Sequence, residues 1–187
     1  GLVLREMIMR QRVRRVVVVA PPSVVIQWRD ELEQRFGLTF MVYDRDFVAR
    51  CRRERGYSIN PWTTHTRFIL SHALLLDEDY AAPLRDLLNA DDDGKPKDGF
   101  DPGSMLILDE AHRAAPTTSS KYALDSHFTR AIRDLAKRFE HRLFLSATPH
   151  NGLSNSFSAL LEILDPQRFV RGIPVEPKLR DEVMVRV

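Results

Sequence analysis

Two adjacent carboxylates carry the most specific chemistry in this sequence. Asp109 and Glu110 directly follow the apolar run from Met105 to Leu108, in the segment LILDEAHRA. At the end of a buried strand, two neighbouring side chains point in different directions. One can hold a magnesium ion through water while the other faces an attacking water as general base. We therefore predict that Asp109 serves the metal and Glu110 the water, although the tetrapeptide alone also fits an acidic helix start.

Small hydroxyl side chains follow a second predicted strand. The segment RLFLS leads into Ser146, Ala147 and Thr148, and hydroxyl groups at such a position can bridge neighbouring strand ends. In a parallel sheet the carboxyl ends of the strands share one edge. We therefore expect Ser146 and Thr148 to lie on the same edge as Asp109 and Glu110.

The first strand and helix have clear sequence signals. The run VVVVA over residues 16–20 is β-branched throughout, which is typical of a strand covered on both faces in a parallel sheet. Pro21 and Pro22 end that strand, and Ser23 can cap the helix that follows. Gly37 ends this helix. The apolar positions of this helix recur every fourth residue, at Val24, Trp28, Leu32 and Phe36.

The remaining segments alternate between strands and helices. Further strands are predicted over residues 39–43, 67–71, 105–108 and 142–145, and helices over 47–55, 81–88, around Ile132 to Phe139 and around Phe157 to Leu164. This order predicts an α/β fold, with a mostly parallel central sheet, helices on both faces and a site at the carboxyl ends of the strands. Residues 89–104 are rich in Asp, Gly and Pro and predict a surface loop inserted into one domain of residues 1–187.

Composition narrows the class of protein. With 187 residues and 43% hydrophobic content, the chain can bury the core of one domain. No apolar run is long enough for a membrane span and the first residues do not form a signal peptide, so we expect a soluble, cytoplasmic protein without membrane partners. Cys51 is the only cysteine, which excludes an internal disulfide and a cysteine metal cluster.

Two arginine clusters stand out against a formal net charge of only +2. Such clusters can meet phosphates, but solvated helix ends are the simpler explanation. The clusters contain Arg5, Arg10, Arg12, Arg14 and Arg15, and Arg50, Arg52, Arg53 and Arg55. The two tryptophans also have plain explanations. Trp28 lies on an apolar helix stripe and Trp62 in a predicted loop, and for both we expect packing in the core rather than stacking on a base.

Four segments occur in an order that resembles a known enzyme family. VVVVAPPS, FILSH, LILDEAH and LFLSATP resemble motifs Ia, Ib, II and III of superfamily 2 helicases, and HNGLSNSFSALLEILDP resembles the stretch after motif III in Snf2 enzymes. The similarity covers nearly the whole chain. It is strongest to the bacterial branch that contains the RNA-polymerase-associated Snf2 ATPase and the helicase-like component of the DISARM phage-defence system. It implies a RecA-like first lobe of a DNA-dependent ATPase.

The resemblance also implies roles for individual residues. Asp109 would bind the magnesium of Mg-ATP, Glu110 would activate the hydrolytic water, and His112 would relay the nucleotide state to a second RecA-like lobe. Ser146, Ala147 and Thr148 would couple hydrolysis to movement. Contacts to the phosphates of double-stranded DNA would come from Pro21, Pro22, Ser23 and Ser71. The implied cofactors are ATP and Mg²⁺, and a DNA-bound protein complex is a further implied partner.

One expected part of the family pattern is missing from the chain. The family places a Gly-Lys-Thr loop just before the helix that begins near Gly1. Gly94 and Lys95 form the only Gly-Lys pair, but Pro96 follows them and aspartates surround them, so they neither follow a buried strand nor open a helix. We therefore expect a partial lobe without its upstream Walker A loop. The isolated chain should be inactive, because a missing arginine finger alone typically costs about 10³ or more in rate.

Two other classes of function remain as alternatives. The chain could be a nucleic-acid-binding module that uses motifs Ia and Ib without hydrolysing ATP. An unrelated P-loop ATPase is disfavoured, because nothing in such a protein requires the motif Ia and Ib pattern. The pathway, the choice between strand separation and translocation, the nucleic-acid preference and the oligomeric state all remain open at this stage.

Overall fold

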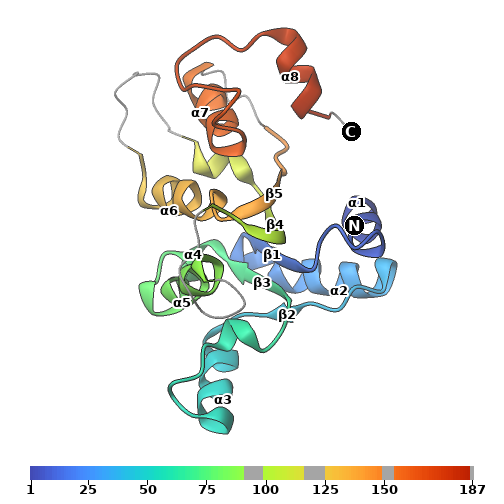
Figure 1. The fold of residues 1–187 in the computed structure, drawn as a ribbon, viewed down its shortest axis with the longest axis vertical. Helices are drawn as coiled ribbons and strands as arrows, with labels where there is room; N and C mark the ends of the chain where they lie inside the picture. Colours follow the sequence, from blue (N-terminus) through green and yellow to red (C-terminus); the bar gives the residue numbers. More distant parts are fainter. Residues whose placement is uncertain (91–98, 116–124, 149–153, 186–187) are drawn as a thin grey trace.

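A sheet of five parallel strands forms the centre of the computed structural model, which describes residues 1–90, 99–115, 125–148 and 154–185 (Figure 1). The strand order is β2-β3-β1-β4-β5, and every pairing is parallel. The strands are β1 (Arg15–Ala20), β2 (Met41–Val42), β3 (Arg67–Ser71), β4 (Asp101–Leu108) and β5 (Phe139–Phe144). The predicted α/β fold with a parallel central sheet is confirmed.

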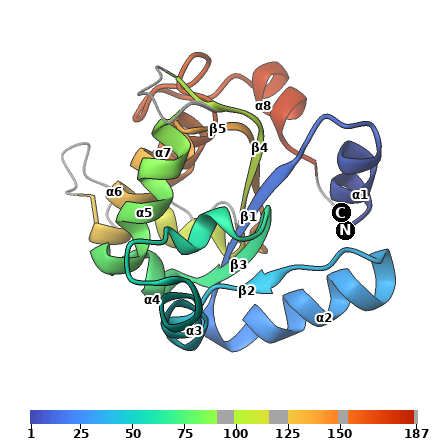
Figure 2. The ribbon, with the colours of Figure 1, turned by 60° about the horizontal axis from the view of Figure 1, so that its bottom comes forward.

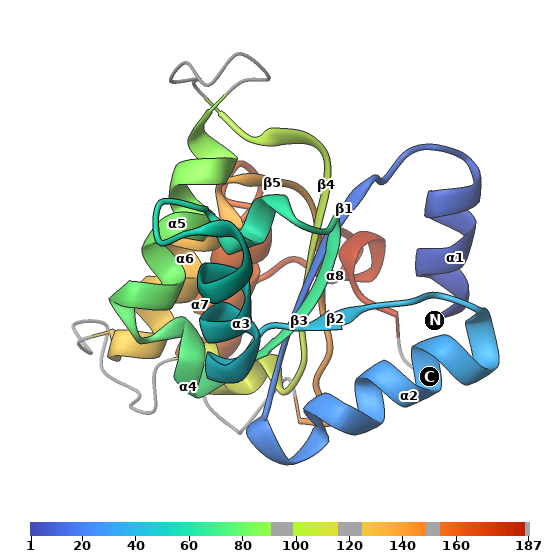
Figure 3. The ribbon, with the colours of Figure 1, turned by 90° about the horizontal axis from the view of Figure 1, so that it is seen from below.

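Helices cover both faces of this sheet. Figures 2 and 3 show α1 and α2 on one side, and α3 to α6 on the other. The helices are α1 (Leu2–Met9), α2 (Val25–Phe36), α3 (Arg45–Arg55), α4 (His72–Leu75), α5 (Glu78–Asn89), α6 (His127–Ala136), α7 (Ser154–Leu164) and α8 (Pro177–Val183). Short 3₁₀ turns lie at η1 (Pro22–Val24), η2 (Pro61–Thr63) and η3 (Ala111–Ala114).

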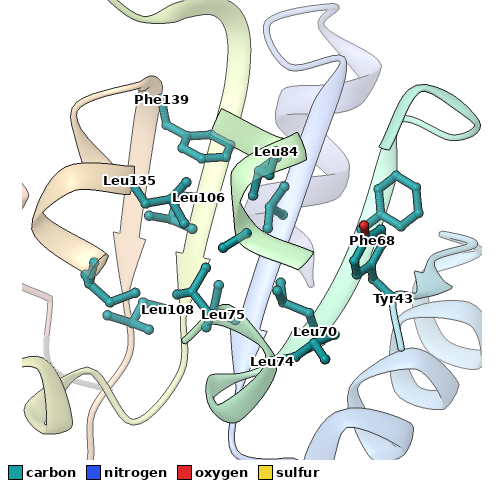
Figure 4. Close-up of a cluster of buried hydrophobic side chains, with 14 of the residues drawn as sticks. Tyr43, Phe68, Leu70, Leu74, Leu75, Leu84, Leu106, Leu108, Leu135 and Phe139 are labelled. Atoms are coloured by element: carbon teal, nitrogen blue, oxygen red, sulfur yellow. The ribbon is translucent and has the colours of Figure 1, made fainter. Parts of the chain in front are cut away.

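The valine run of β1 divides its side chains between two cores. Val17 and Val19 pack in the larger cluster under α3 to α7, together with Leu106 and Leu108 of β4 (Figure 4). The alternate valines of β1 pack in a second cluster under α1 and α2. Because successive side chains of a strand point to opposite faces, a run that is apolar at every position fits a strand that is covered on both sides.

The boundaries of α2 were predicted only in part. Gly37 ends the helix in the left-handed conformation, with φ 64°, as expected of a glycine at this position. Ser23 does not cap it. The chain first makes the η1 turn, so Val24 occupies the N-cap position and no side chain accepts a hydrogen bond there. Two consecutive prolines fix the backbone before Ser23 and shift the helix start beyond it.

Strand β4 begins earlier than the sequence predicts. Asp101 to Ser104 belong to the strand and not to the loop predicted over residues 89–104. Asp101 is buried, and its carboxylate pairs with Arg15 at 3.0 Å, while the Ser104 hydroxyl accepts a hydrogen bond from the Glu140 amide. Polar side chains can extend a strand when neighbouring strands satisfy them. The centre of that loop, with Gly94 and Lys95, lies outside the described residues.

The predicted boundary between the helix around Ile132 and the following strand was also wrong. The helix ends at Ala136, and Phe139 begins β5 instead of continuing the helix face. Phe139 is still fully buried in the same cluster as Ile132 and Leu135. The apolar period therefore continued across a change of secondary structure, and the sequence pattern could not reveal that change. Helix α8 was not predicted, and its Leu179 and Val183 pack against α7 in a small separate cluster.

Helix α3 shows why an arginine cluster need not mark a site. Phe47, Val48 and Cys51 face the core, whereas Arg50 and Arg53 are exposed to solvent. This matches the interpretation of a solvated helix face. No helix among the described residues is long and apolar enough to cross a membrane.

Candidate active site

The carboxyl ends of four neighbouring strands gather the predicted site residues at one edge of the sheet. Pairing in register places Ser71 beside Ala20, and Leu108 of β4 beside both Val19 of β1 and Phe144 of β5. The segments that follow these strands therefore emerge together. They carry Pro21, Pro22, Ser23, Ser71, Asp109, Glu110, His112 and Ser146.

Asp109 is held at four of its polar atoms. Its amide donates to the carbonyl oxygen of Val19 at 2.9 Å. Its Oδ1 accepts from the Glu110 amide at 2.9 Å, and its Oδ2 accepts from the Nε1 of Trp28 at 2.9 Å. Its carbonyl oxygen lies 3.1 Å from the Nε2 of His72. The carboxylate is half-buried, so its direction is fixed while it keeps some access to solvent.

Glu110 adopts a backbone conformation that is unusual for a residue with a side chain. Its φ of 50° and ψ of 46° lie in the left-handed region, where Gln11 is the only other non-glycine residue with positive φ among the described residues. Such a conformation costs on the order of 1 to 3 kcal/mol and persists where surrounding contacts enforce it. Here the amide of Ala111 donates to the carbonyl oxygen of Leu145 at 2.8 Å, which ties the turn to the end of β5.

His112 connects the acidic segment after β4 to the hydroxyl-bearing segment after β5. Its Nδ1 lies 3.1 Å from Oε2 of Glu110 and 3.2 Å from Oγ of Ser146. The Ser146 hydroxyl also accepts a hydrogen bond from the Thr148 amide at 3.2 Å. Ala147 and Thr148 are exposed. The expectation that the acidic pair and Ser146 share one edge of the sheet therefore agrees with the geometry.

His72 is a buried imidazole beneath this edge, and sequence analysis did not assign it to the site. It is only 4% exposed, and its ring packs against the ring of Phe128 with centroids 4.6 Å apart. Burial, and to a smaller extent the nearby positive charge of Arg113, lower the pKa of His72 to about 4. The ring is therefore neutral at pH 7. Its Nε2 carries the proton and donates to the carbonyl oxygen of Asp109, since a carbonyl can only accept.

Trp28 also has a role that the sequence prediction missed. Its ring packs against the core under α1 and α2, as predicted, but its indole N–H reaches the carboxylate of Asp109. A buried indole normally finds an acceptor, so the residue type itself was the available signal. Trp62, in contrast, is confirmed as a packing residue. It is 1% exposed and stacks on Tyr43 with ring centroids 3.9 Å apart.

Two hollows flank Asp109. One, of about 250 Å³, is lined by Asp109 with the N-terminal Gly1 and with residues of α2, among them Trp28, Glu31 and Phe36. The other, of about 860 Å³, is lined by Asp109, Glu110 and the end of β5 on one side and by α7 and the segment after α8 on the other. Its lining includes Ser146, Ala147, Thr148, Phe157, Leu160, Leu161, Leu164 and Met184. Both hollows lie at the edge where ligands of open α/β sheets bind.

The predicted nucleic-acid contacts lie beside each other after β1 and β3. Pro22 and Ser23 are exposed, whereas Pro21 is half-buried and accepts a hydrogen bond from the Val24 amide at 3.1 Å. The hydroxyl of Ser71 accepts from the Leu74 amide at 3.2 Å and so caps α4. A hydroxyl that accepts one hydrogen bond keeps its own proton to donate.

Comparisons with known proteins agree with this geometry. Residues 2–172 match the model of the SNF2-related domain family. Over 172 residues the chain is 31% identical to the RNA polymerase-associated protein RapA of Haemophilus influenzae, and over 173 residues it is 30% identical to RapA of Pasteurella multocida. Each alignment covers 90% of this chain but only 16% of the relative, so the chain spans a small part of the length of these proteins.

A solved structure has a similar fold. The SWI2/SNF2 ATPase core of Sulfolobus solfataricus, in complex with dsDNA, superposes with a TM-score of 0.57 at 16% sequence identity. The superposition covers 88% of this chain and 28% of that one. At this level of identity the likeness concerns the fold.

Proposed function

The chain belongs to the SNF2-related domain family, and on that premise we propose that it forms part of the first RecA-like lobe of a DNA-dependent ATPase. In this proposal the complete enzyme moves along double-stranded DNA or remodels a protein complex bound to it. The similar proteins support this choice of partners, since one is an RNA polymerase-associated protein and another is an ATPase core in complex with dsDNA.

The observation that carries the proposal is the cluster formed by Glu110, His112 and Ser146. These side chains follow two neighbouring strands, and one imidazole nitrogen lies within 3.2 Å of both partners. The cluster connects Glu110, a candidate general base, to the segment after β5 that would transmit the nucleotide state. The left-handed backbone at Glu110 adds support, because such strained conformations cluster at functional sites.

Glu110 is the proposed general base. Its carboxylate would take a proton from the water that attacks the terminal phosphate of ATP, and His112 would orient that carboxylate through Oε2. Glu110 lines the larger hollow, which is large enough for a nucleotide.

Asp109 is the residue that would hold Mg²⁺, through water. Each carboxylate oxygen accepts one hydrogen bond and keeps further acceptor capacity, and hard oxygen ligands suit this ion. When bound, the ion would neutralise charge on the phosphates of ATP. The Trp28 and Glu110 N–H groups keep the Asp109 carboxylate in one orientation toward such an ion.

A phosphate-binding loop is the main part that the proposal requires in addition. Gly1 and Asp109 line the same small hollow, so a loop joined directly to Gly1 would face the proposed metal ligand. We propose that the residues preceding Gly1 in the complete protein supply a Gly-rich loop ending in Lys and Thr or Ser. The opposing arginine and half of the DNA surface would come from a second RecA-like lobe.

The proposed DNA contacts are the turn after β1 and the half-buried end of β3. Pro21, Pro22 and Ser23 would present backbone groups to one phosphate, and Ser71 would donate its hydroxyl proton to another. Ser146, Ala147 and Thr148 would couple hydrolysis to movement, and His112 would relay the nucleotide state to the second lobe. The alternative is a nucleic-acid-binding module that uses these same contacts without hydrolysis.

The deciding experiment measures ATP hydrolysis by the full-length protein that carries this chain, with and without duplex DNA. Glu110→Gln should lower the DNA-stimulated rate by about 10² to 10⁴, the usual effect of losing a general base. Glu54→Gln on the exposed face of α3 is the matched control and should hydrolyse ATP at the wild-type rate. Equal rates for the wild type and Glu110→Gln would exclude Glu110 as the base. A wild-type protein that binds DNA but does not hydrolyse ATP would favour the binding-module alternative.

A further inference from the structure

Two ring N–H groups converge on Asp109 from the elements that directly follow the two proposed DNA contacts. The Trp28 indole reaches the carboxylate Oδ2 at 2.9 Å, and the His72 imidazole reaches the carbonyl oxygen at 3.1 Å. Both donors come from outside strand β4, which carries Asp109. Asp109 is therefore connected by side chains to the helices that follow β1, the strand beside β4, and β3, the strand beyond β1.

Trp28 is rigidly joined to the turn after β1. This turn, η1, passes directly into α2, and Trp28 lies on the first turn of that helix. The ring is also fixed by its packing against the core under α1 and α2. A displacement of residues 21–23 by a bound phosphate would move the start of α2, and with it the indole N–H.

His72 is joined even more closely to the end of β3. It follows Ser71 directly, and the Ser71 hydroxyl caps the short helix α4 that His72 begins. The imidazole is buried and packs against Phe128 of α6, so it cannot rotate away without disturbing the core. A phosphate that engages Ser71 would therefore act directly on the residue that holds the Asp109 carbonyl oxygen.

We propose that Trp28 and His72 are positioning residues through which DNA bound at the two proposed contacts affects the orientation of Asp109. The ligand class is the phosphate backbone of duplex DNA, and the quantity controlled is the orientation of the proposed Mg²⁺ ligand. The inference rests on the proposed function. It assigns to these two rings a role in DNA stimulation of hydrolysis, in addition to their packing.

Linkage gives the proposal a second consequence. If DNA binding favours the active orientation of Asp109, then binding of Mg²⁺ and nucleotide must favour DNA binding by the same factor. Loss of either ring donor should weaken both effects together. A residue that only supports the fold would lower stability without changing this reciprocal factor.

The test uses the full-length protein with Trp28→Phe and His72→Phe, which keep an aromatic ring and remove the donor. The readouts are the ratio of ATP hydrolysis at saturating duplex DNA to hydrolysis without DNA, and the change in DNA affinity when Mg²⁺ and a non-hydrolysable ATP analogue are added. We expect each variant to lose about five-fold or more in both quantities, the lower range of allosteric coupling. The loss should fall on kcat more than on the KM for ATP.

Matched controls separate positioning from packing. Trp62→Phe removes a buried indole N–H that donates to the carbonyl oxygen of Tyr80 at 3.1 Å, far from the site, and should keep the wild-type ratio. His72→Gln keeps an N–H donor and should restore part of the ratio that His72→Phe loses. If His72→Phe does not fold, the comparison of Trp28→Phe, which loses a donor to Asp109, with Trp62→Phe, which does not, still decides.

The possible failures are distinguishable. A wild-type protein without DNA stimulation would overturn the proposed function itself. A wild-type protein that is stimulated, with Trp28→Phe and His72→Phe stimulated to the same extent, would overturn only the positioning role. An equal loss of stimulation in Trp62→Phe would also overturn it, because the effect would then follow from core packing in general.

Discussion

The indole Nε1 of Trp28 donates a hydrogen bond of 2.9 Å to Oδ2 of Asp109, which lies 81 positions further along the chain. This contact joins the helix that follows β1 to the acidic end of β4. It makes Asp109 a residue whose orientation depends on a neighbouring element, and it gives the site a built-in spectroscopic reporter.

The Trp28 contact predicts a fluorescence change. The sequence has two tryptophans, so Trp62→Phe leaves Trp28 as the only emitter. Excitation moves electron density away from the pyrrole ring, so the adjacent Asp109 carboxylate stabilises the excited state. In the Trp62→Phe background, Asp109→Asn should therefore shift the emission maximum to shorter wavelength. Asp165→Asn, remote from Trp28, is the control, and identical spectra for all three proteins would contradict the contact.

Stability should depend on pH through His72. Burial lowers the pKa of His72 in the folded state to about 4 from 6.5, so protonation favours the unfolded state. The contribution of neutral His72 is complete above the unfolded pKa. It decreases as the pH falls from 6.5 toward about 4, and Arg113, Asp109 and the packed Phe128 are the groups that face the ring.

Denaturant unfolding at pH 7.5 and pH 4.5 tests this dependence. From pH 7.5 to pH 4.5, the free energy of unfolding of the wild type should fall by on the order of 2 kcal/mol more than that of His72→Phe, as a shift of about two pKa units implies. His65→Phe, at an exposed position, should lose as much as the wild type. Parallel losses in wild type and His72→Phe would mean that His72 titrates normally.

Ser146 should matter more for movement than for hydrolysis. Its hydroxyl contacts His112 at 3.2 Å and accepts the Thr148 amide, so Ser146→Ala removes the side-chain link between the acidic turn and the end of β5 and leaves the backbone hydrogen bond from Ala111 to Leu145. In the full-length protein we expect the rate of translocation along duplex DNA to fall more than the rate of ATP hydrolysis, measured in parallel. Ser58→Ala on an exposed loop is the control. Equal reductions of both rates would argue against a coupling role.

Position 37 needs glycine because of its backbone conformation, and not because a side chain would lack room. A side-chain carbon added there would meet nothing within 4 Å, but the residue has φ 64°. Gly37→Ala should therefore lower the free energy of unfolding by about 1 kcal/mol, because the left-handed conformation disfavours a Cβ. Gly37→Asn should cost less, since Asn tolerates this region better. Thermal unfolding of the three proteins would show the order.

The larger core should be intolerant of truncation at Leu106. This residue lies on β4, between β1 and β5, and its side chain is fully buried in the cluster of Figure 4. Leu106→Ala should destabilise the domain by about 2 to 5 kcal/mol, the usual range when a buried leucine leaves a cavity. Ile26→Ala, at a position that is 50% exposed, should change the stability by less than about 0.5 kcal/mol.

Elements with a purely local signal were predictable. β3 was predicted with the bounds that the structure has, and β1 with one residue fewer, because a short apolar run between polar segments marks a covered strand by itself. Boundaries that depend on neighbours were not. Asp101 extends β4 because Arg15 pairs with it, and no residue close to it in the sequence announces that pair.

The candidate site divides in the same way. The sequence alone determined that Asp109, Glu110 and Ser146 follow strands, because residue type and apolar patterning are local properties. The tertiary structure decided that Trp28 and His72 donate to Asp109, and that His112 bridges Glu110 and Ser146. These contacts depend on the strand order β2-β3-β1-β4-β5, which brings distant segments within hydrogen-bonding distance and which no local pattern encodes.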